Sequence, residues 1–174
     1  IAHYTAIAQA VSLPIICYNV PGRTGVNLLP ATFAKLAELD NIVAIKEASG
    51  NMEQIEEAIR LSRGKADVYS GDDGITVPVM AMGGIGVISV VSNVAPKFTS
   101  DMTSAMLAGD IAKAADMQLK MLPFVKAMFS EVNPIPVKKA AEMRGLCNGI
   151  LRLPLTEMTE ENTKKLAELL PDFN

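Results

Sequence analysis

Lys46 closes a short apolar segment, residues 42–45, that is typical of a buried strand. Side chains alternate across a strand, so Lys46 shares a face with the small residues Ala44 and Ala48, whereas Glu47 points the other way. A lysine held there away from water has a lowered pKa and supplies the neutral amine that attacks a ketone. The alternative is a lysine that leans into solvent at the strand end. Position alone does not decide between the two.

Three other residues with useful chemistry stand near the ends of neighbouring segments. Tyr18 lies near the end of the apolar segment 13–20, where its hydroxyl can exchange protons with a substrate, or where it is simply a core tyrosine. Arg23 follows in the loop 21–25, and its planar guanidinium either binds a carboxylate or is a solvated surface charge. Gly71 either lets a substrate approach the backbone or forms a tight turn.

The elements that position these residues follow from the apolar pattern. Residues 1–11 predict a helix with one apolar face, formed by Ile1, Tyr4, Ile7, Ala8 and Val11. Strands are predicted over 13–20, 42–46, 66–69 and 85–91. Helices are predicted over 30–39, over 52–63 with Asn51 as the cap, and after Gly74. Strands that are apolar on both faces indicate a parallel sheet covered by helices. In such folds the site lies at the carboxyl ends of the strands.

Beyond the fourth strand the pattern predicts helices alone, over 96–108, 111–130, 137–144 and 160–170. Thr159 is expected to cap the last helix, Pro123 to kink the second, and the prolines in 133–136 to keep that link extended. We therefore expect a β/α part over residues 1–95 and a carboxyl-terminal helical region over 96–174 that packs on it.

Four such units form either a small doubly wound sheet or the second half of an eight-stranded barrel. No glycine-rich phosphate-binding motif follows the first strand, which disfavours a nucleotide-binding sheet. The chain begins at Ile1, without Met and inside a helical pattern. This start indicates a fragment or a processed product and suits the half-barrel.

Four motifs occur together: Tyr-Asn-Val-Pro-Gly-Arg-Thr-Gly at 18–25, Ile-Lys-Glu-Ala-Ser-Gly at 45–50, Ser-Gly-Asp-Asp at 70–73 and Gly-Val-Ile-Ser at 86–89. In this order they resemble the dihydrodipicolinate synthase and N-acetylneuraminate lyase superfamily. The resemblance extends through Asn-Pro-Ile-Pro-Val-Lys at 133–138 to the closing helices. It implies an α/β fold, a TIM (β/α)8 barrel with extra carboxyl-terminal helices, of which this chain holds the last four β/α units.

The resemblance also implies roles for the site residues. Lys46 is the Schiff-base lysine that forms a covalent imine with pyruvate, so that no cofactor is needed, and Tyr18 is the proton-relay tyrosine. Gly71 and the backbone of Ile88 belong to the substrate site. Arg23 binds the carboxylate of aspartate semialdehyde, and since the neuraminate lyases lack this arginine, it favours the synthase. The implied product is hydroxytetrahydrodipicolinate, in lysine and diaminopimelate biosynthesis.

Everything before the fourth helix of that family is absent from the chain. The missing part includes the paired-threonine region of the proton relay, a second tyrosine donated between subunits, and the inhibitory lysine site. A barrel opened in this way exposes two sheet edges, so we expect the chain to be stable only with its missing half or as an oligomer, a tetramer by resemblance. The alternatives are a related 2-keto-acid aldolase and a catalytically silent fragment or assembly module.

The composition argues against nucleic-acid binding, histidine-based catalysis and a membrane span. The chain has 174 residues, 49% hydrophobic and 20% charged, with a formal net charge of -3, which gives no basic field for nucleic acid. His3 is the only histidine, which disfavours a histidine-based triad or metal site, and we expect no metal. No apolar run is long enough for a membrane span, and Cys17 and Cys147 are expected to be buried in a reducing environment, so a cytoplasmic protein is predicted.

Overall fold

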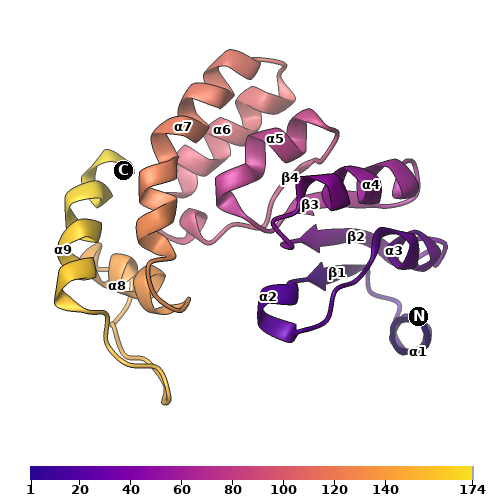
Figure 1. Cartoon of the computed structure of the whole chain (residues 1–174), viewed down its shortest axis with the longest axis horizontal. Helices are drawn as coiled ribbons and strands as arrows, with labels where there is room; N and C mark the ends of the chain where they lie inside the picture. The colour runs from indigo at the N-terminus through magenta and orange to yellow at the C-terminus, as the bar shows by residue number, and fades with distance from the viewer. Residues whose placement is uncertain (174) are drawn as a thin grey trace. The chain divides into compact units, whose positions relative to one another are not determined.

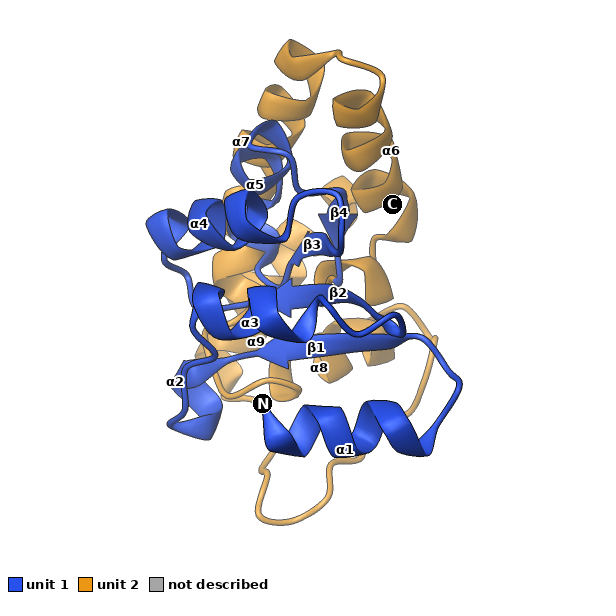
Figure 2. Ribbon diagram, turned by 90° about the vertical axis from the view of Figure 1, so that its right-hand side faces the viewer, with its two compact units in different colours: residues 1–88 blue, residues 89–174 orange. Residues whose placement is uncertain are grey.

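The computed structural model describes residues 1–173, which fold into two compact units. The first unit is Ile1–Ile88 and the second begins at Ser89 (Figure 2). Residues 89–95, which the sequence assigns to the β/α part, therefore group with the helices that follow them.

The first unit contains a four-stranded parallel sheet whose strand order follows the chain (Figure 1). Its outer strands are the first and the last, so each presents one unpaired edge within this sheet. The strands are β1 (Ile15–Asn19), β2 (Ile42–Glu47), β3 (Asp67–Ser70) and β4 (Gly86–Val87).

The fourth strand is much shorter than the predicted 85–91. Only Gly86 and Val87 lie in the sheet, and the Ile88 N–H still donates to the Ser70 carbonyl at 2.9 Å. After that, the Ser89 hydroxyl accepts from the Ser92 N–H at 2.8 Å. Such local side-chain hydrogen bonds compete with sheet pairing, and the chain turns into the 3-10 helix η2 (Val91–Asn93).

Five α-helices connect or precede these strands. Asn51 caps α4 as predicted, since its Oδ1 accepts from the Gln54 N–H at 3.2 Å. The segment expected as a loop at 21–25 is instead the short helix α2, because Pro21 suits the first helical position and Gly25 ends it with a φ of 69°. The helices are α1 (Ala2–Ala10), α2 (Pro21–Thr24), α3 (Pro30–Leu36), α4 (Met52–Ser62) and α5 (Thr76–Ala81), the last preceded by the 3-10 helix η1 (Asp73–Ile75).

One face of the sheet packs against these helices. Cys17, Ile45 and Val68 project from the three longer strands into a core that also holds Phe33, Leu36, Ile55 and Val79. The predicted helix forms as α1, but its apolar face is only partly buried: Ala8 is buried and Tyr4 partly buried, whereas Ile7 and Val11 are 38% and 41% exposed. The helix meets the core only through the side that carries Tyr4 and Ala8.

The two cysteines differ, contrary to the expectation that both are buried. Cys147 is exposed, whereas burial raises the pKa of the Cys17 thiol to about 11, a hydrogen bond with Tyr4 acting in the opposite direction. We therefore expect a thiol reagent at pH 8 to titrate one cysteine rapidly and the second only when the chain unfolds. The Cys147→Ser variant should lose the rapid phase. Two rapid thiols in the native wild-type chain would contradict the burial of Cys17.

The second unit is helical. Pro123 lies inside α7, where its missing N–H removes one helical hydrogen bond. The expected extended link at 133–136 is partly wrong, because α8 already begins at Ile135; Pro136 is tolerated there because first-turn N–H groups have no helical partner. The helices are α6 (Pro96–Leu107), α7 (Ile111–Met128), α8 (Ile135–Met143), α9 (Glu160–Leu169) and η3 (Leu170–Phe173).

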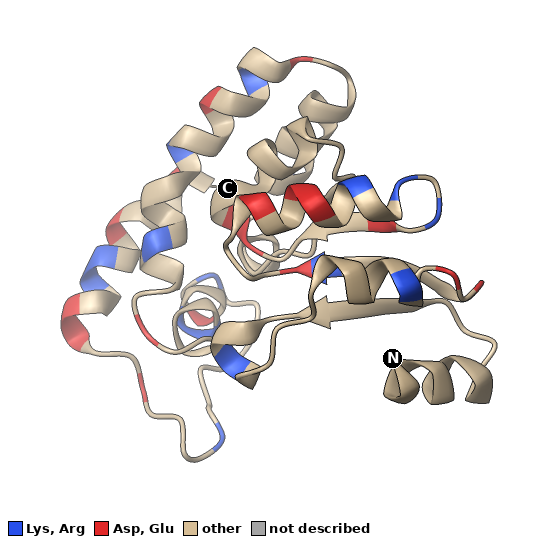
Figure 3. Cartoon of the chain, turned by 45° about the vertical axis from the view of Figure 1, so that its right-hand side comes forward, with Lys and Arg blue, Asp and Glu red and all other residues tan. Residues whose placement is uncertain are grey.

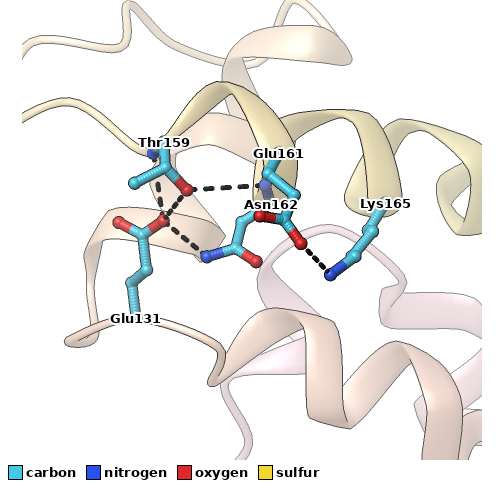
Figure 4. A network of polar contacts seen from close by, with 5 residues as sticks. All are labelled: Glu131, Thr159, Glu161, Asn162 and Lys165. Atoms are coloured by element: carbon cyan, nitrogen blue, oxygen red, sulfur yellow. Dashed lines mark hydrogen bonds and ion pairs between the residues drawn. The ribbon is translucent and has the colours of Figure 1, made fainter.

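Glu131 reinforces the start of α9 (Figure 4). Thr159 caps this helix as predicted, accepting from the Asn162 N–H at 3.4 Å. Glu131 Oε1 in turn accepts from the Thr159 N–H at 3.0 Å, the Thr159 hydroxyl at 2.7 Å and Asn162 Nδ2 at 2.8 Å. These donors, Asn162 first and then the Thr159 hydroxyl, lower the pKa of the Glu131 carboxyl.

Because its pKa is lowered by folding, Glu131 stabilises the fold at neutral pH, and this contribution is lost as the pH falls below the ordinary carboxyl value of 4.5 toward the lowered one. We expect Glu131→Ala to reduce the free energy of unfolding by about 1 kcal/mol at pH 7. Urea unfolding at pH 7 and pH 3.5 would show the difference from wild type shrinking with acid. The exposed Glu157→Ala is the control, and an equal loss at both pH values would contradict the role of the ionised carboxylate.

Acidic and basic residues are interspersed along α7 and α9, whereas in α4 three glutamates precede Arg60, and α1 carries neither (Figure 3). Among residues 1–173, no helix combines the length and the apolar character that a membrane crossing requires.

Candidate active site

Three side chains stand level with one another on one face of the sheet. The register pairs Tyr18 of β1 with Lys46 of β2, and Lys46 with Tyr69 of β3. Each is the second-last residue of its strand, so all three lie at the carboxyl end of the parallel sheet and on the face opposite Cys17, Ile45 and Val68. This is the end at which parallel α/β enzymes place their reactive groups.

Lys46 lies on the face that alternation predicts, with Glu47 pointing the other way into the protein. The Lys46 Nζ is 4.3 Å from the centroid of the Tyr18 ring, a distance at which ammonium and ring attract each other. Lys46 is only half-buried, however, and Tyr18 is 44% exposed. The environment of Lys46 thus lies between the two alternatives that its position in the sequence left open, a lysine held away from water and a lysine that leans into solvent.

Gly71 has a steric role that the sequence analysis did not predict. Its N–H donates to the Glu47 carbonyl at 2.7 Å. A Cβ at this position would lie 2.6 Å from Ala48 Cβ and 3.1 Å from Lys46 Cγ. The absent side chain therefore admits the Lys46 stem and Ala48, and the contact fixes the base of the lysine side chain.

Ile88 and Arg23 are placed differently. Ile88 is joined to the third strand through its N–H bond to Ser70, beyond the row of Tyr18, Lys46 and Tyr69. Arg23 is exposed on α2 and forms no ion pair within residues 1–173. The structure thus brings Tyr18, Lys46 and Gly71 together, and it shows no contact that ties Arg23 to them.

The sequence analysis missed Tyr69, which occupies in β3 the position that Tyr18 and Lys46 occupy in their strands. It also missed the final residues of the same strands, Asn19, Glu47 and Ser70, which we call the polar layer. All three are buried, with exposed fractions of 2%, 1% and 0%. The sequence did contain a signal for these residues: in each strand a polar residue directly follows the residue that faces the site.

Among residues 1–173, no three side chains of metal-binding type come together.

Comparison with known proteins extends these observations. Residues 1–172 match the sequence model of a family described as the Dihydrodipicolinate synthetase family. The chain is 53% identical over 169 residues to the 4-hydroxy-tetrahydrodipicolinate synthase of Lachnoclostridium phytofermentans, covering 97% of this chain and 58% of that protein. The chain thus spans somewhat more than half the length of the curated relatives that it matches.

Solved structures of dihydrodipicolinate synthases also superimpose closely on this chain. Dihydrodipicolinate synthase from Thermotoga maritima superimposes with a TM-score of 0.96 at 42% identity, over 98% of this chain and 59% of that one. The chloride-inhibited synthase from Acinetobacter baumannii, described as complexed with pyruvate, gives 0.94 at 44% identity over the same shares. These neighbours confirm the fragment of a (β/α)8 barrel and exclude the doubly wound alternative. The chain belongs to the dihydrodipicolinate synthetase family.

Proposed function

We propose that this chain carries the Schiff-base half of a 4-hydroxy-tetrahydrodipicolinate synthase, which condenses pyruvate with aspartate semialdehyde. The observation that carries the proposal is Lys46, at the carboxyl end of a parallel sheet and in contact with Tyr18, in a chain that is 53% identical to a protein of that name. The pyruvate complex of the Acinetobacter baumannii relative supports the first substrate.

In the proposed reaction, the neutral Lys46 amine attacks the ketone carbon of pyruvate, and loss of water gives an imine. The protonated imine nitrogen withdraws electrons, so a methyl proton of the bound pyruvate is lost and an enamine forms. The enamine carbon then bonds to the aldehyde carbon of aspartate semialdehyde, whose oxygen takes up a proton. Attack by the semialdehyde amine on the imine carbon closes the ring and frees Lys46.

The remaining site residues support these steps. Tyr18 lies beside the Lys46 ammonium and has a hydroxyl able to carry protons to and from the substrate. The Ile88 N–H is engaged by Ser70, so the Ile88 carbonyl is the backbone group that we assign to pyruvate. The exposed guanidinium of Arg23 is assigned to the carboxylate of the semialdehyde. The imine itself supplies the electron sink, and no cofactor is part of the proposal.

The working unit in this proposal is an eight-stranded barrel. The sheet has unpaired edges at β1 and β4, and its site face leaves Ile16 and Tyr18 46% and 44% exposed. Four further β/α units, on the same polypeptide or on another, would pair with both edges and remove Lys46 from water. A homotetramer of such barrels in the cytoplasm completes the proposal.

Incubation with pyruvate and borohydride tests the function. We expect mass spectrometry of the digested chain to show reduced pyruvate on Lys46 when the first four β/α units of the Lachnoclostridium phytofermentans relative are supplied, and weaker labelling without them. Labelling of neither sample would sink the Schiff-base assignment. Labelling only with the added units would show that the chain alone is catalytically silent. Turnover with aspartate semialdehyde, but not with sugar acids, would separate the synthase from a related 2-keto-acid aldolase.

A further inference from the structure

Glu47 is a buried residue of β2 whose carboxylate lies on the face of the sheet opposite Lys46 and Tyr18. It forms no ion pair among residues 1–173, and three N–H groups satisfy it instead. Its Oε1 accepts from the Ser49 N–H at 2.6 Å, and its Oε2 accepts from Asn19 Nδ2 at 2.9 Å and Gln54 Nε2 at 3.2 Å. A buried charge without a cation is costly unless such donors are held in place.

Asn27 and Leu28 hold the donors of Glu47. Asn27 Oδ1 accepts from Asn19 Nδ2 at 2.9 Å and from Gln54 Nε2 at 3.0 Å, and Asn27 Nδ2 donates to Gln54 Oε1 at 2.8 Å. The Leu28 N–H donates to Asn19 Oδ1 at 2.8 Å. The network therefore joins the ends of β1 and β2, the start of α4, and the segment that follows the helix of Arg23.

We propose that Glu47, acting through Asn19 and Gln54, is a positioning residue that sets the directions of Lys46 and Tyr18. Glu47 directly follows Lys46, and Asn19 directly follows Tyr18, so a bond between Glu47 and Asn19 fixes the rotation of both strand ends. The Ala48 N–H completes this link by donating to the Asn19 carbonyl at 2.8 Å. This inference rests on the proposed function, in which Lys46 is the nucleophile.

The role requires a carboxylate, not merely a polar side chain. Glutamine at position 47 has one accepting oxygen and one donating NH2 group. In one orientation of the glutamine amide, its NH2 group faces the Ser49 N–H, so that two donors meet without an acceptor. In the other orientation, the NH2 group faces the N–H donors of Asn19 and Gln54 in the same way. Either opposition is relieved by a shift of the β2 end, which carries Lys46. Displacements of about 1 Å at a reacting group can cost roughly 100-fold in rate.

The test compares Glu47→Gln with the exposed Glu56→Gln of α4, in whichever preparation of the wild type, alone or with the complementary units, labels on Lys46. At saturating pyruvate, we expect the rate of borohydride-trapped adduct per folded chain to fall roughly 10- to 100-fold in Glu47→Gln. The pyruvate concentration for half-maximal trapping should stay within about twofold, because Glu47 faces away from the substrate. Glu56→Gln should match wild type.

Two further measurements keep the result decisive. Gln54→Leu removes one of the three donors from a half-buried position, so it should fold even if Glu47→Gln does not, and its trapping rate should fall by about threefold or more. The ring resonances of Tyr18, assigned with Tyr18→Phe, report the Lys46–Tyr18 contact without pyruvate and should shift in both network variants but not in Glu56→Gln.

Wild-type trapping rates and unmoved Tyr18 resonances in the folded network variants would overturn the positioning role. A wild type that never labels would refute the proposed function instead, and the Tyr18 resonances alone would then decide whether Glu47 orients the site.

Discussion

The Lys46→Arg variant should form no borohydride-trapped pyruvate adduct under conditions in which the wild type does. Arginine keeps the positive charge and the contact with the Tyr18 ring, but its guanidinium stays protonated and supplies no free electron pair for a ketone. Because Lys46 is half-buried and forms no ion pair with any of residues 1–173, the free energy of unfolding should change by less than about 1 kcal/mol. The measurement is the intact mass of the chain after pyruvate and borohydride treatment, with circular dichroism to confirm the fold.

Lys35→Arg on α3 is the matched control, since Lys35 is an exposed lysine of the same unit. It should keep the full adduct yield. If Lys46→Arg retained the adduct while a different lysine carried the label, the nucleophile would have been assigned to the wrong residue.

The Gly71→Ala variant should lose both stability and reactivity. The new Cβ would stand 2.6 Å from Ala48 Cβ and 3.0 Å from the Glu47 carbonyl oxygen, closer than such atoms pack. The backbone cannot retreat freely, because the Gly71 N–H is bonded to that same oxygen at 2.7 Å. We expect a loss of about 1–3 kcal/mol in the free energy of unfolding, together with slower adduct formation as the Lys46 stem is displaced. Urea unfolding and the trapping rate per folded chain measure the two effects.

Gly22→Ala on α2 separates the steric effect from the general cost of replacing a glycine. Apart from the neighbouring residues and the backbone of α2 itself, no heavy atom of residues 1–173 lies within 4 Å of a Cβ at Gly22, and alanine favours a helix, so stability should be unchanged or raised by up to about 1 kcal/mol. Equal unfolding curves for Gly71→Ala and wild type would show that the strand ends yield easily at this point.

Many of the strands and helix caps could be predicted from sequence. Short apolar runs placed three strands to within a few residues, and Asn51 and Thr159 were identified as caps because their side chains accept hydrogen bonds from local N–H groups. The face occupied by Lys46 followed from simple alternation along a strand. Such features depend on residues close together in the chain, which is why sequence alone reached them.

The features that the sequence analysis got wrong or missed depend on contacts beyond the local pattern of the chain. The fourth strand was drawn too long because its apolar residues do not reveal that Ser89 offers a competing turn. The network around Glu47 joins Asn19 and Asn27 to Gln54, which lies 27 residues beyond Asn27, and only the packing of α4 and of the segment after α2 at the ends of β1 and β2 brings them together. The partial exposure of Lys46 depends on which elements cover the sheet, and no strand pattern encodes that.

The alternation at the strand ends has a consequence for engineering. In three adjacent strands, one residue faces the site and the next, buried and hydrogen-bonded, belongs to the polar layer. Under the proposed function, neighbours in sequence therefore have different roles: one side chain faces the reacting groups, and the next one holds the ends of the strands together. If the proposed function holds, a library meant to redirect the enzyme toward other keto acids should vary Tyr69, keep Tyr18 and Lys46 for the reaction, and leave Asn19, Glu47 and Ser70 untouched. Randomising the strand ends as continuous blocks would mix the two classes and fill the library with chains that no longer hold their lysine in place.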